Sequence, residues 1–194
     1  MTWATDVGAT LTDAGISTTV SESFEEVTVD VPAGDWVLAL TTARDSLTLD
    51  YFDWLSAVDE QDEGFHVVAH LYDPRNRRRL LLRTSVTSES PALATATEVF
   101  RGASWHERET HEMFGIDFVG HPYQVPLLLP DGFEGHPLRK EFVLAARVAK
   151  PWPGAKEPGE SDKDAAPSRR KTLPPGVPDP ATWGPDAPRT EEPS

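Results

Sequence analysis

The sequence predicts a domain that contains both α-helices and β-strands, followed by an extended C-terminal arm and a disordered proline-rich tail. Short stretches with strand-like apolar patterns alternate with stretches in which apolar residues recur at helical spacing. Eleven of the eighteen prolines come after residue 149. We therefore expect one domain over residues 1–149, with the arm at about 116–149, and a disordered tail over 150–194.

The expected strands differ in pattern. Residues 24–31 alternate apolar and polar side chains, which is the period of a half-buried strand. Three more strongly apolar stretches follow at 51–58, 65–72 and 79–86. The sequence Asp-Pro-Arg-Asn at 73–76 is typical of a turn, so we expect the last two strands to form a hairpin.

Helical spacing or helix-start residues mark four further stretches. We expect helices at 3–14, 32–44, 91–99 and 104–114. In the last of these, Ser104 is expected to cap the first turn, Glu107 to complete a capping box and Gly115 to end the helix. The apolar Trp105, Met113 and Phe114 of this helix are expected to be buried.

Composition excludes several classes of function. Residues 1–149 hold 24 acidic and 11 basic side chains, a net charge of −13 within a total of −14, and an acidic body argues against general nucleic-acid binding. The chain has no cysteine, which excludes disulfides, thiolate-ligated Fe–S clusters and a cysteine nucleophile. No glycine-rich phosphate loop of the GxGxxG or GxxxxGK[ST] type occurs, so neither NADH nor ATP would be bound by a recognisable device.

The sequence also bears on location. Its first residues lack a basic stretch followed by an apolar run, so no secretory signal is expected. No window approaches ~18 consecutive apolar residues, so we expect membrane association only through partners. The lack of cysteine fits a reducing cytoplasm.

A metal site is one interpretation of the histidines in the 104–114 helix. His106 and His111 are five residues apart, about 140° around a helix, whereas zinc proteases place two histidines four apart on one face. A small metal-dependent hydrolase using both histidines with Glu107 and Glu109 stays as an alternative. A second alternative is a stand-alone acidic binding module.

Two segments of the chain together form a long pattern of defined order and spacing. The first runs through the 104–114 helix into the start of the arm, and the second lies further along the arm. They read Trp105-x-Glu107-Arg108-Glu109-x-x-Glu112-Met113-Phe114-Gly115-Ile116 with Phe118-x-Gly120-His121-Pro122, and then Leu129-Pro130-Asp131-x-Phe133-Glu134-Gly135-His136-Pro137-Leu138-Arg139-Lys140-x-Phe142. This pattern resembles the signature of the 30-kDa subunit family of respiratory complex I, the NADH–quinone oxidoreductase. The likeness covers roughly residues 25–145.

The resemblance implies an α+β fold, in which a mixed or antiparallel sheet is flanked by helices. It also implies a cofactor-free structural role in the enzyme's peripheral arm. The chain would dock on the 49-kDa-type subunit, near other peripheral-arm subunits (B, I and G), on the cytoplasmic face of the bacterial cell membrane. FMN, Fe–S clusters and quinone would lie in partner subunits, so that the whole complex passes electrons from NADH to quinone and translocates protons. No catalytic, cofactor-binding or metal residue is expected in this chain.

The same resemblance implies a partner interface on the two segments. Its expected residues are Glu107, Arg108, Glu109, Glu112, His121, Pro122, Gly135, His136, Pro137, Leu138, Arg139 and Lys140. The chain departs from the family pattern at Glu112, where aspartate is usual, at His111, where an aromatic is usual, and at 123–126, where a basic pair is missing. A divergent or second copy, or an equivalent subunit of membrane-bound hydrogenases or F420H2-type dehydrogenases, stays open.

Overall fold

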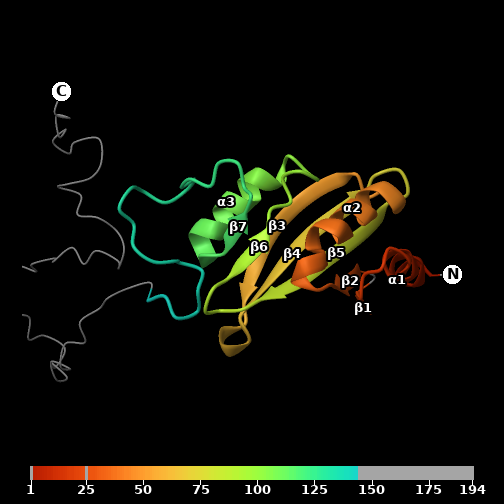
Figure 1. The fold of residues 1–194 in the computed structure, drawn as a ribbon, viewed down its shortest axis with the longest axis horizontal. Helices are drawn as coiled ribbons and strands as arrows, with labels where there is room; N and C mark the ends of the chain where they lie inside the picture. Colours follow the sequence, from red (N-terminus) through yellow and green to blue (C-terminus); the bar gives the residue numbers. More distant parts are fainter. Residues whose placement is uncertain (1, 25, 144–194) are drawn as a thin grey trace, which may run out of the picture. The chain divides into compact units, whose positions relative to one another are not determined.

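The computed structural model describes residues 2–24 and 26–143. In chain order the elements are α1 (Trp3–Asp13), β1 (Thr19–Ser23), β2 (Glu26–Asp30), the 3-10 turn η1 (Ala33–Asp35), α2 (Trp36–Ser46), β3 (Tyr51–Asp59), the 3-10 turn η2 (Gln61–Glu63), β4 (Phe65–Asp73), β5 (Arg78–Val86), β6 (Ala92–Ala94), α3 (Ala103–Phe114) and β7 (Asp117–Val119) (Figure 1).

The main sheet is mixed and has the strand order β1-β2-β5-β4-β3. Only the β2–β5 pair is parallel, and the other three pairs are antiparallel. A separate pair of short parallel strands, β6 and β7, stands beside α3. The predicted α+β class with a mixed sheet and flanking helices is therefore confirmed.

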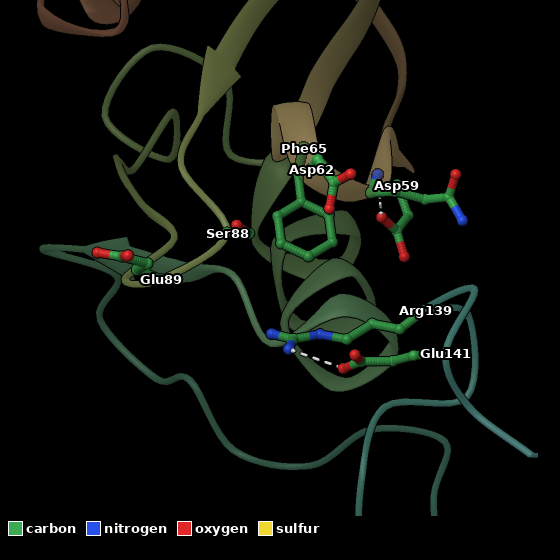
Figure 2. A pocket seen from close by; sticks show the side chains of 8 residues that line it. Asp59, Asp62, Phe65, Ser88, Glu89, Arg139 and Glu141 are labelled. Atoms are coloured by element: carbon green, nitrogen blue, oxygen red, sulfur yellow. Dashed lines mark hydrogen bonds and ion pairs between the residues drawn. The ribbon is translucent and has the colours of Figure 1, made fainter.

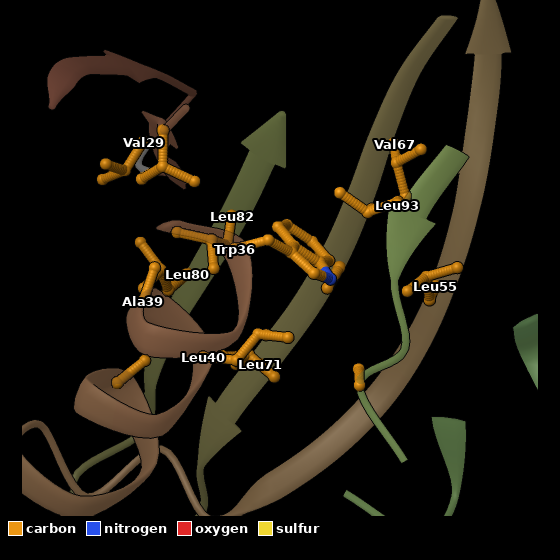
Figure 3. Packing of buried hydrophobic residues seen from close by; sticks show 14 of the residues in the cluster. Val29, Trp36, Ala39, Leu40, Leu55, Val67, Leu71, Leu80, Leu82 and Leu93 are labelled. Carbon is orange, nitrogen blue, oxygen red and sulfur yellow. The ribbon is translucent and has the colours of Figure 1, made fainter. Parts of the chain in front are cut away.

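Helix α2 supplies the centre of the core. Its apolar residues Trp36, Ala39, Leu40 and Ala43 recur at helical spacing, and all four are fully buried. They pack among buried side chains of the sheet, which include Val29, Leu71, Leu80 and Leu82 (Figure 3). Each large apolar side chain that is fully buried contributes about 1.5–3 kcal/mol.

The predicted β4–β5 hairpin is confirmed, with Asp73 opposite Arg78 at its end. The Asp73 carboxylate accepts hydrogen bonds from Asn76 Nδ2 at 2.6 Å, Thr48 Oγ1 at 2.8 Å and the Arg75 amide at 2.9 Å. The Asn76 side chain is the largest cause that lowers the pKa of Asp73, which falls to about 2. This carboxylate therefore holds the turn and ties it to the segment after α2.

Two local predictions are wrong. Residues 91–99 are not a helix, because β6 pairs with β7 and the Thr95 amide extends the pairing by donating to Val119 O at 3.0 Å. The capping box at the start of α3 is also absent, because the N-cap is Gly102 and makes no side-chain hydrogen bond. The Glu107 carboxylate, which was expected to complete that box, instead accepts hydrogen bonds from Thr95 and Ala96. Strand β1 is an exposed polar edge strand whose pattern predicts no strand by itself.

The expected arm contains β7 at its start, and residues 120–143 carry turns and bends. Within the described ranges, no helix or strand follows Val119. Residues 144–149 of the arm and the whole proline-rich tail at 150–194 lie outside the described residues.

Replacing Asp73 with alanine should lower the Tm of the chain at neutral pH. A carboxylate whose pKa is depressed on folding adds stability above its unfolded pKa, and that stability is lost as pH falls toward about 2. The Tm difference between wild type and Asp73→Ala should therefore shrink between about pH 5 and pH 2 in thermal melts. The matched control is Asp50→Ala, which removes an exposed ion pair with Arg75. A difference that stays constant with pH would contradict the assignment.

Candidate functional site

Helix α3 carries most of the first of the two segments that form the signature. The helix ends where the sequence predicted. Gly115 lies in the left-handed region at φ 74°, and its amide donates to His111 O. The side chains of the motif point to different environments. Glu107 is fully buried and Glu109 is exposed, while Trp105 is 63% exposed, so its predicted burial is wrong. Phe114 is buried as predicted, and Met113 packs against the core.

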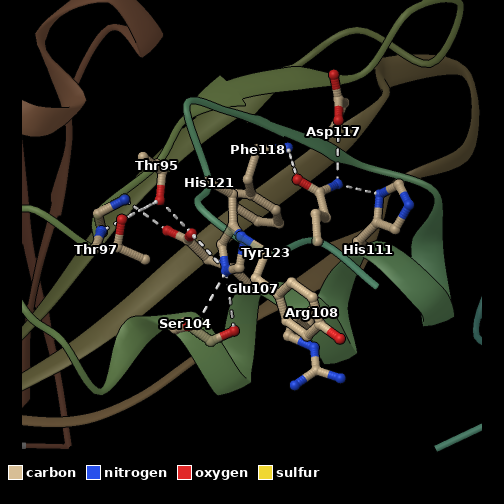
Figure 4. Close-up of polar contacts among 12 residues, drawn as sticks. Thr95, Thr97, Ser104, Glu107, Arg108, His111, Asp117, Phe118, His121 and Tyr123 are labelled. Carbon is tan, nitrogen blue, oxygen red and sulfur yellow. Dashed lines mark hydrogen bonds and ion pairs between the residues drawn. The ribbon is translucent and has the colours of Figure 1, made fainter. Parts of the chain in front are cut away.

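The Glu107 carboxylate ties α3 to the end of β6. It accepts hydrogen bonds from Thr95 Oγ1 at 2.5 Å and from the Ala96 amide at 2.6 Å (Figure 4). Burial raises the pKa of Glu107 to about 7, although both hydrogen bonds act in the opposite direction. The sequence did not identify Thr95 and Ala96 as site residues. The only signal for them was the general requirement that a buried carboxylate accept hydrogen bonds.

His121 joins the same group from the Gly-His-Pro segment. Its Nδ1 accepts from the Tyr123 amide at 3.0 Å, so the proton of the neutral ring lies on Nε2. Nε2 is 3.2 Å from both the carbonyl and the hydroxyl of Ser104, and 3.9 Å from Glu107 Oε2. The structure thus brings together two predicted residues, Glu107 and His121, whereas the adjacent Pro122 is exposed.

Arg108 holds the next part of the arm. Its Nε donates to Val125 O at 2.9 Å and its Nη2 donates to Pro126 O at 2.8 Å. The guanidinium also lies 5.5 Å from the centre of the Trp105 ring and 5.6 Å from that of Tyr123. A planar fork between two rings is an arrangement that lysine cannot reproduce.

Glu112 binds the backbone of the arm directly after the residues that Arg108 holds. Its carboxylate accepts from the amides of Leu127 at 2.6 Å, Leu128 at 2.8 Å and Leu129 at 3.3 Å. Three consecutive amides directed at one carboxylate form an anion-binding loop, with the anion supplied by the helix. Glu112, which stands where the family resemblance leads to aspartate, therefore provides a carboxylate that reaches the arm.

The second segment closes the C-terminal end of α3. His136 Nδ1 donates to Glu112 O at 2.8 Å, and Arg139 Nε donates to Phe114 O at 2.6 Å. Between them, the Leu138 amide donates to Met113 O at 3.1 Å. These carbonyls have no partners inside the helix, so the segment supplies the missing donors.

Gly115 is required where the two segments meet. A Cβ at this position would lie 2.5 Å from His136 Nε2 and 2.7 Å from Arg139 Nη2. Its positive φ would also strain any other residue. His136 and Arg139 of the second segment can therefore pack against the first segment because residue 115 has no side chain.

A pocket of about 570 Å³ opens beside Arg139 (Figure 2). The guanidinium lies 5.1 Å from the centre of the Phe65 ring, and Nη1 is 3.7 Å from Glu141 Oε1. Burial opposes ionisation of Asp59, but hydrogen bonds from the Lys140 and Gln61 amides lower the pKa of its carboxyl. The lining residues are Asp59, Gln61, Asp62, Phe65, Ser88, Glu89, Arg139 and Glu141.

The two histidines of the metal interpretation contact different parts of the chain. The His106 ring packs edge-on against Phe52 at 5.5 Å, whereas His111 Nδ1 lies 2.9 Å from Ile116 O. The described part of the chain holds no cluster of three or more His, Asp or Glu side chains arranged for a metal ion. None of its helices combines the length and the apolar character needed to cross a bilayer.

Among the remaining predicted residues, Glu109, Gly135, Leu138 and Lys140 are exposed and Pro137 is half-buried. Lys140 Nζ is 4.0 Å from Glu60 Oε2. The predicted set therefore divides into residues used inside the chain and residues left at its surface.

Comparison with known proteins gives consistent matches. A sequence model of the family described as "Respiratory-chain NADH dehydrogenase, 30 Kd subunit" matches residues 29–148. The C subunit of the NADH-quinone oxidoreductase of Chelativorans sp. (strain BNC1) is 37% identical over 130 residues, which cover 65% of this chain but only 64% of that protein. The same subunit of Citrifermentans bemidjiense is 37% identical over 131 residues, covering 66% of this chain and 81% of its own.

Two solved structures share the fold. A trypsin-resistant fragment of Nqo5 has a TM-score of 0.52 at 23% identity, covering 60% of this chain and 98% of the fragment. A chain of the membrane-bound sulfane sulfur reductase, an archaeal respiratory membrane complex, has a TM-score of 0.57 at 23% identity and covers 66% and 76% respectively. At this identity the likeness concerns the fold alone.

Replacing Glu107 with glutamine should remove a pH dependence of stability. Because its folded pKa of about 7 lies above the ordinary value of 4.5, Glu107 adds stability that is present below about pH 4.5 and lost as pH rises to about 7. The loss is on the order of 3 kcal/mol across this window. Urea unfolding at several pH values should show that loss in wild type and in the exposed control Glu109→Gln, but not in Glu107→Gln. Equal pH slopes in all three proteins would rule out the assignment.

Replacing Glu112 with alanine should release the arm at 127–129. Three amides would exchange a charged acceptor for water, and each such bond is worth roughly 1.5–3 kcal/mol at most. Hydrogen exchange at residues 127–129 should accelerate at least about tenfold, while core amides such as Leu71 keep their rates. Glu109→Ala, on the same helix, is the control. Unchanged exchange at 127–129 would show that the carboxylate does not hold the loop.

Proposed function

Because this chain belongs to the 30-kDa subunit family of respiratory-chain NADH dehydrogenase, we propose that it is a structural component of the peripheral arm of a proton-translocating NADH–quinone oxidoreductase. It would dock on the 49-kDa-type subunit, near other peripheral-arm subunits (B, I and G), on the cytoplasmic face of the bacterial cell membrane. The family match over residues 29–148 carries this proposal, supported by relatives named as the C subunit of NADH-quinone oxidoreductase.

The proposed subunit holds no redox group of its own. FMN, Fe–S clusters and quinone would belong to partner subunits, through which electrons pass from NADH. The complete lack of cysteine supports this division, because Fe–S clusters are held mainly by cysteine thiolates. The contribution of this chain is then to set the geometry of its neighbours.

The surface formed by the two segments and the residues between them suits such docking. Large apolar side chains remain exposed, with Trp105 at 63%, Tyr123 at 64%, Leu128 at 58% and Leu138 at 54%. Exposed aromatic and aliphatic groups among charged ones are typical of a protein interface. The charged Glu109 and Lys140 would contact the partner directly.

The buried and half-buried members of the predicted interface would act indirectly. Glu107 is fully enclosed, while Glu112 and Arg139 bind the backbone of the chain itself. Their role in docking would be to keep the arm in the shape that the partner recognises. Preorganisation of this kind lowers the entropic cost of association.

Replacing Arg108 with alanine should weaken assembly, because it removes the donors to Val125 O and Pro126 O and the contacts with two exposed rings. We expect partner recovery to fall roughly tenfold, the usual effect of losing an interface anchor. Arg108→Lys keeps the charge and should recover little, since lysine lacks the planar fork. Normal assembly of Arg108→Ala would argue against this role.

The decisive experiment is affinity purification of the tagged chain from gently solubilised native membranes, with mass spectrometry and with iron and flavin assays. A 49-kDa-type partner with iron and FMN would support the proposal. The same partner with iron but no flavin would indicate a hydrogenase or a related assembly, such as an F420H2-type dehydrogenase. A lone chain with stoichiometric metal would favour the hydrolase alternative.

A further inference from the structure

The guanidinium of Arg108 keeps one edge unused while its other edge holds the arm. Its Nε donates to Val125 O at 2.9 Å and its Nη2 donates to Pro126 O at 2.8 Å. The terminal edge, where Nη1 and Nη2 each carry a further N–H, makes no hydrogen bond within the described residues, and Figure 4 shows these nitrogens directed away from α3. Two parallel N–H groups of this kind match the two oxygens of a carboxylate.

The positive charge of Arg108 is also left without a carboxylate. None of the ion pairs among residues 2–24 and 26–143 includes it. Glu112, on the same face of α3, binds the amides of 127–129, and Asp117 accepts from Gln124 Nε2 at 3.1 Å. Glu109 is exposed on the helix and forms no ion pair with Arg108. The two carbonyls satisfy donors of the guanidinium but do not neutralise its charge.

Two aromatic rings hold this guanidinium in place. Its centre lies 5.5 Å from the Trp105 ring and 5.6 Å from the Tyr123 ring, although both side chains are largely exposed, at 63% and 64%. A partner that covered these rings would exclude water from the unused edge. A charge-assisted hydrogen bond formed there would then be stronger than an exposed surface ion pair. This arrangement accounts for the exposure of Trp105, which its residue type does not predict.

We propose that the terminal edge of Arg108 binds the side-chain carboxylate of an aspartate or glutamate on the partner subunit. This rests on the proposed function, which supplies the partner. Residues 1–149 hold 24 acidic and 11 basic side chains, so an acidic group that approaches most of this body is repelled. An uncompensated guanidinium between two exposed rings therefore selects the position at which an acidic group of the partner can dock.

The first test reverses the charge on both sides of the contact. In the full-length tagged chain, Arg108→Glu should lower the recovery of the partner from solubilised membranes roughly tenfold or more. The control Arg101→Glu makes the same change at an exposed arginine just before α3 and should stay within about twofold of wild type. Each aspartate and glutamate of the partner, and of this chain, is then changed singly to lysine. One substitution in the partner should restore recovery with Arg108→Glu to within about threefold of wild type.

The second test separates binding from folding, because Arg108 also holds residues 125 and 126. It uses Arg108→Gln, and it replaces each acidic residue of the partner singly by its amide. One amide substitution should lower recovery roughly tenfold with the wild-type chain but less than about twofold with Arg108→Gln, because that contact is already lost. Equal losses in both backgrounds for every acidic residue would overturn the carboxylate site.

The outcomes distinguish this site from the proposed function. Rescue by a substitution in a 49-kDa-type subunit would support both, and rescue in a protein outside the oxidoreductase would uphold the site and reject the proposed function. If the wild-type chain recovers a 49-kDa-type subunit but no substitution rescues Arg108→Glu or couples to Arg108→Gln, the site alone is rejected. A loss of recovery in Arg101→Glu as large as that in Arg108→Glu, or rescue by a lysine within this chain, would also overturn the site.

Discussion

The C-terminal end of α3 is the point on which the arrangement of the arm depends. A helix leaves its last carbonyls without partners, and here the donors come from residues 24 and 25 positions further along, the side chains of His136 and Arg139 and the amide of Leu138. Gly115 makes the closure possible, because a Cβ would collide with the two side chains. The donors of the second segment therefore have one defined place, and the intervening chain must loop out and return to it.

Two carboxylates of the same helix organise that loop. Glu112 gathers three consecutive amides, and Glu107 secures the strand pair that precedes and follows the helix. A buried or partly buried carboxylate is costly unless donors surround it, so each acid is satisfied only when the arm or β6 is in position. In its described residues after Val119, the arm has no helix or strand that could fix its conformation. The polar groups fix it instead.

The family signature takes on a structural meaning from these contacts. The side chains of four of its charged residues bind backbone groups of their own chain, which explains why order and spacing matter as much as residue type; they are Glu107, Arg108, Glu112 and Arg139. What they hold outward is a set of exposed rings and leucines, the kind of surface that a partner would cover. In the proposed function, recognition depends on a shape that the chain maintains internally.

The sequence by itself determined that the chain contains both helices and strands, and it determined the strands of the hairpin and the end of α3 at Gly115, because alternation, turn chemistry and helix stops are local signals. Only the tertiary structure decided that residues 92–94 form a strand, since their partner lies at 117–119 and parallel pairing overrides a weak helical preference. It likewise decided the roles of the acids. The resemblance implied that Glu107 and Glu112 lie at a partner interface, but which amides of their own chain they bind depended on contacts between segments distant in the chain.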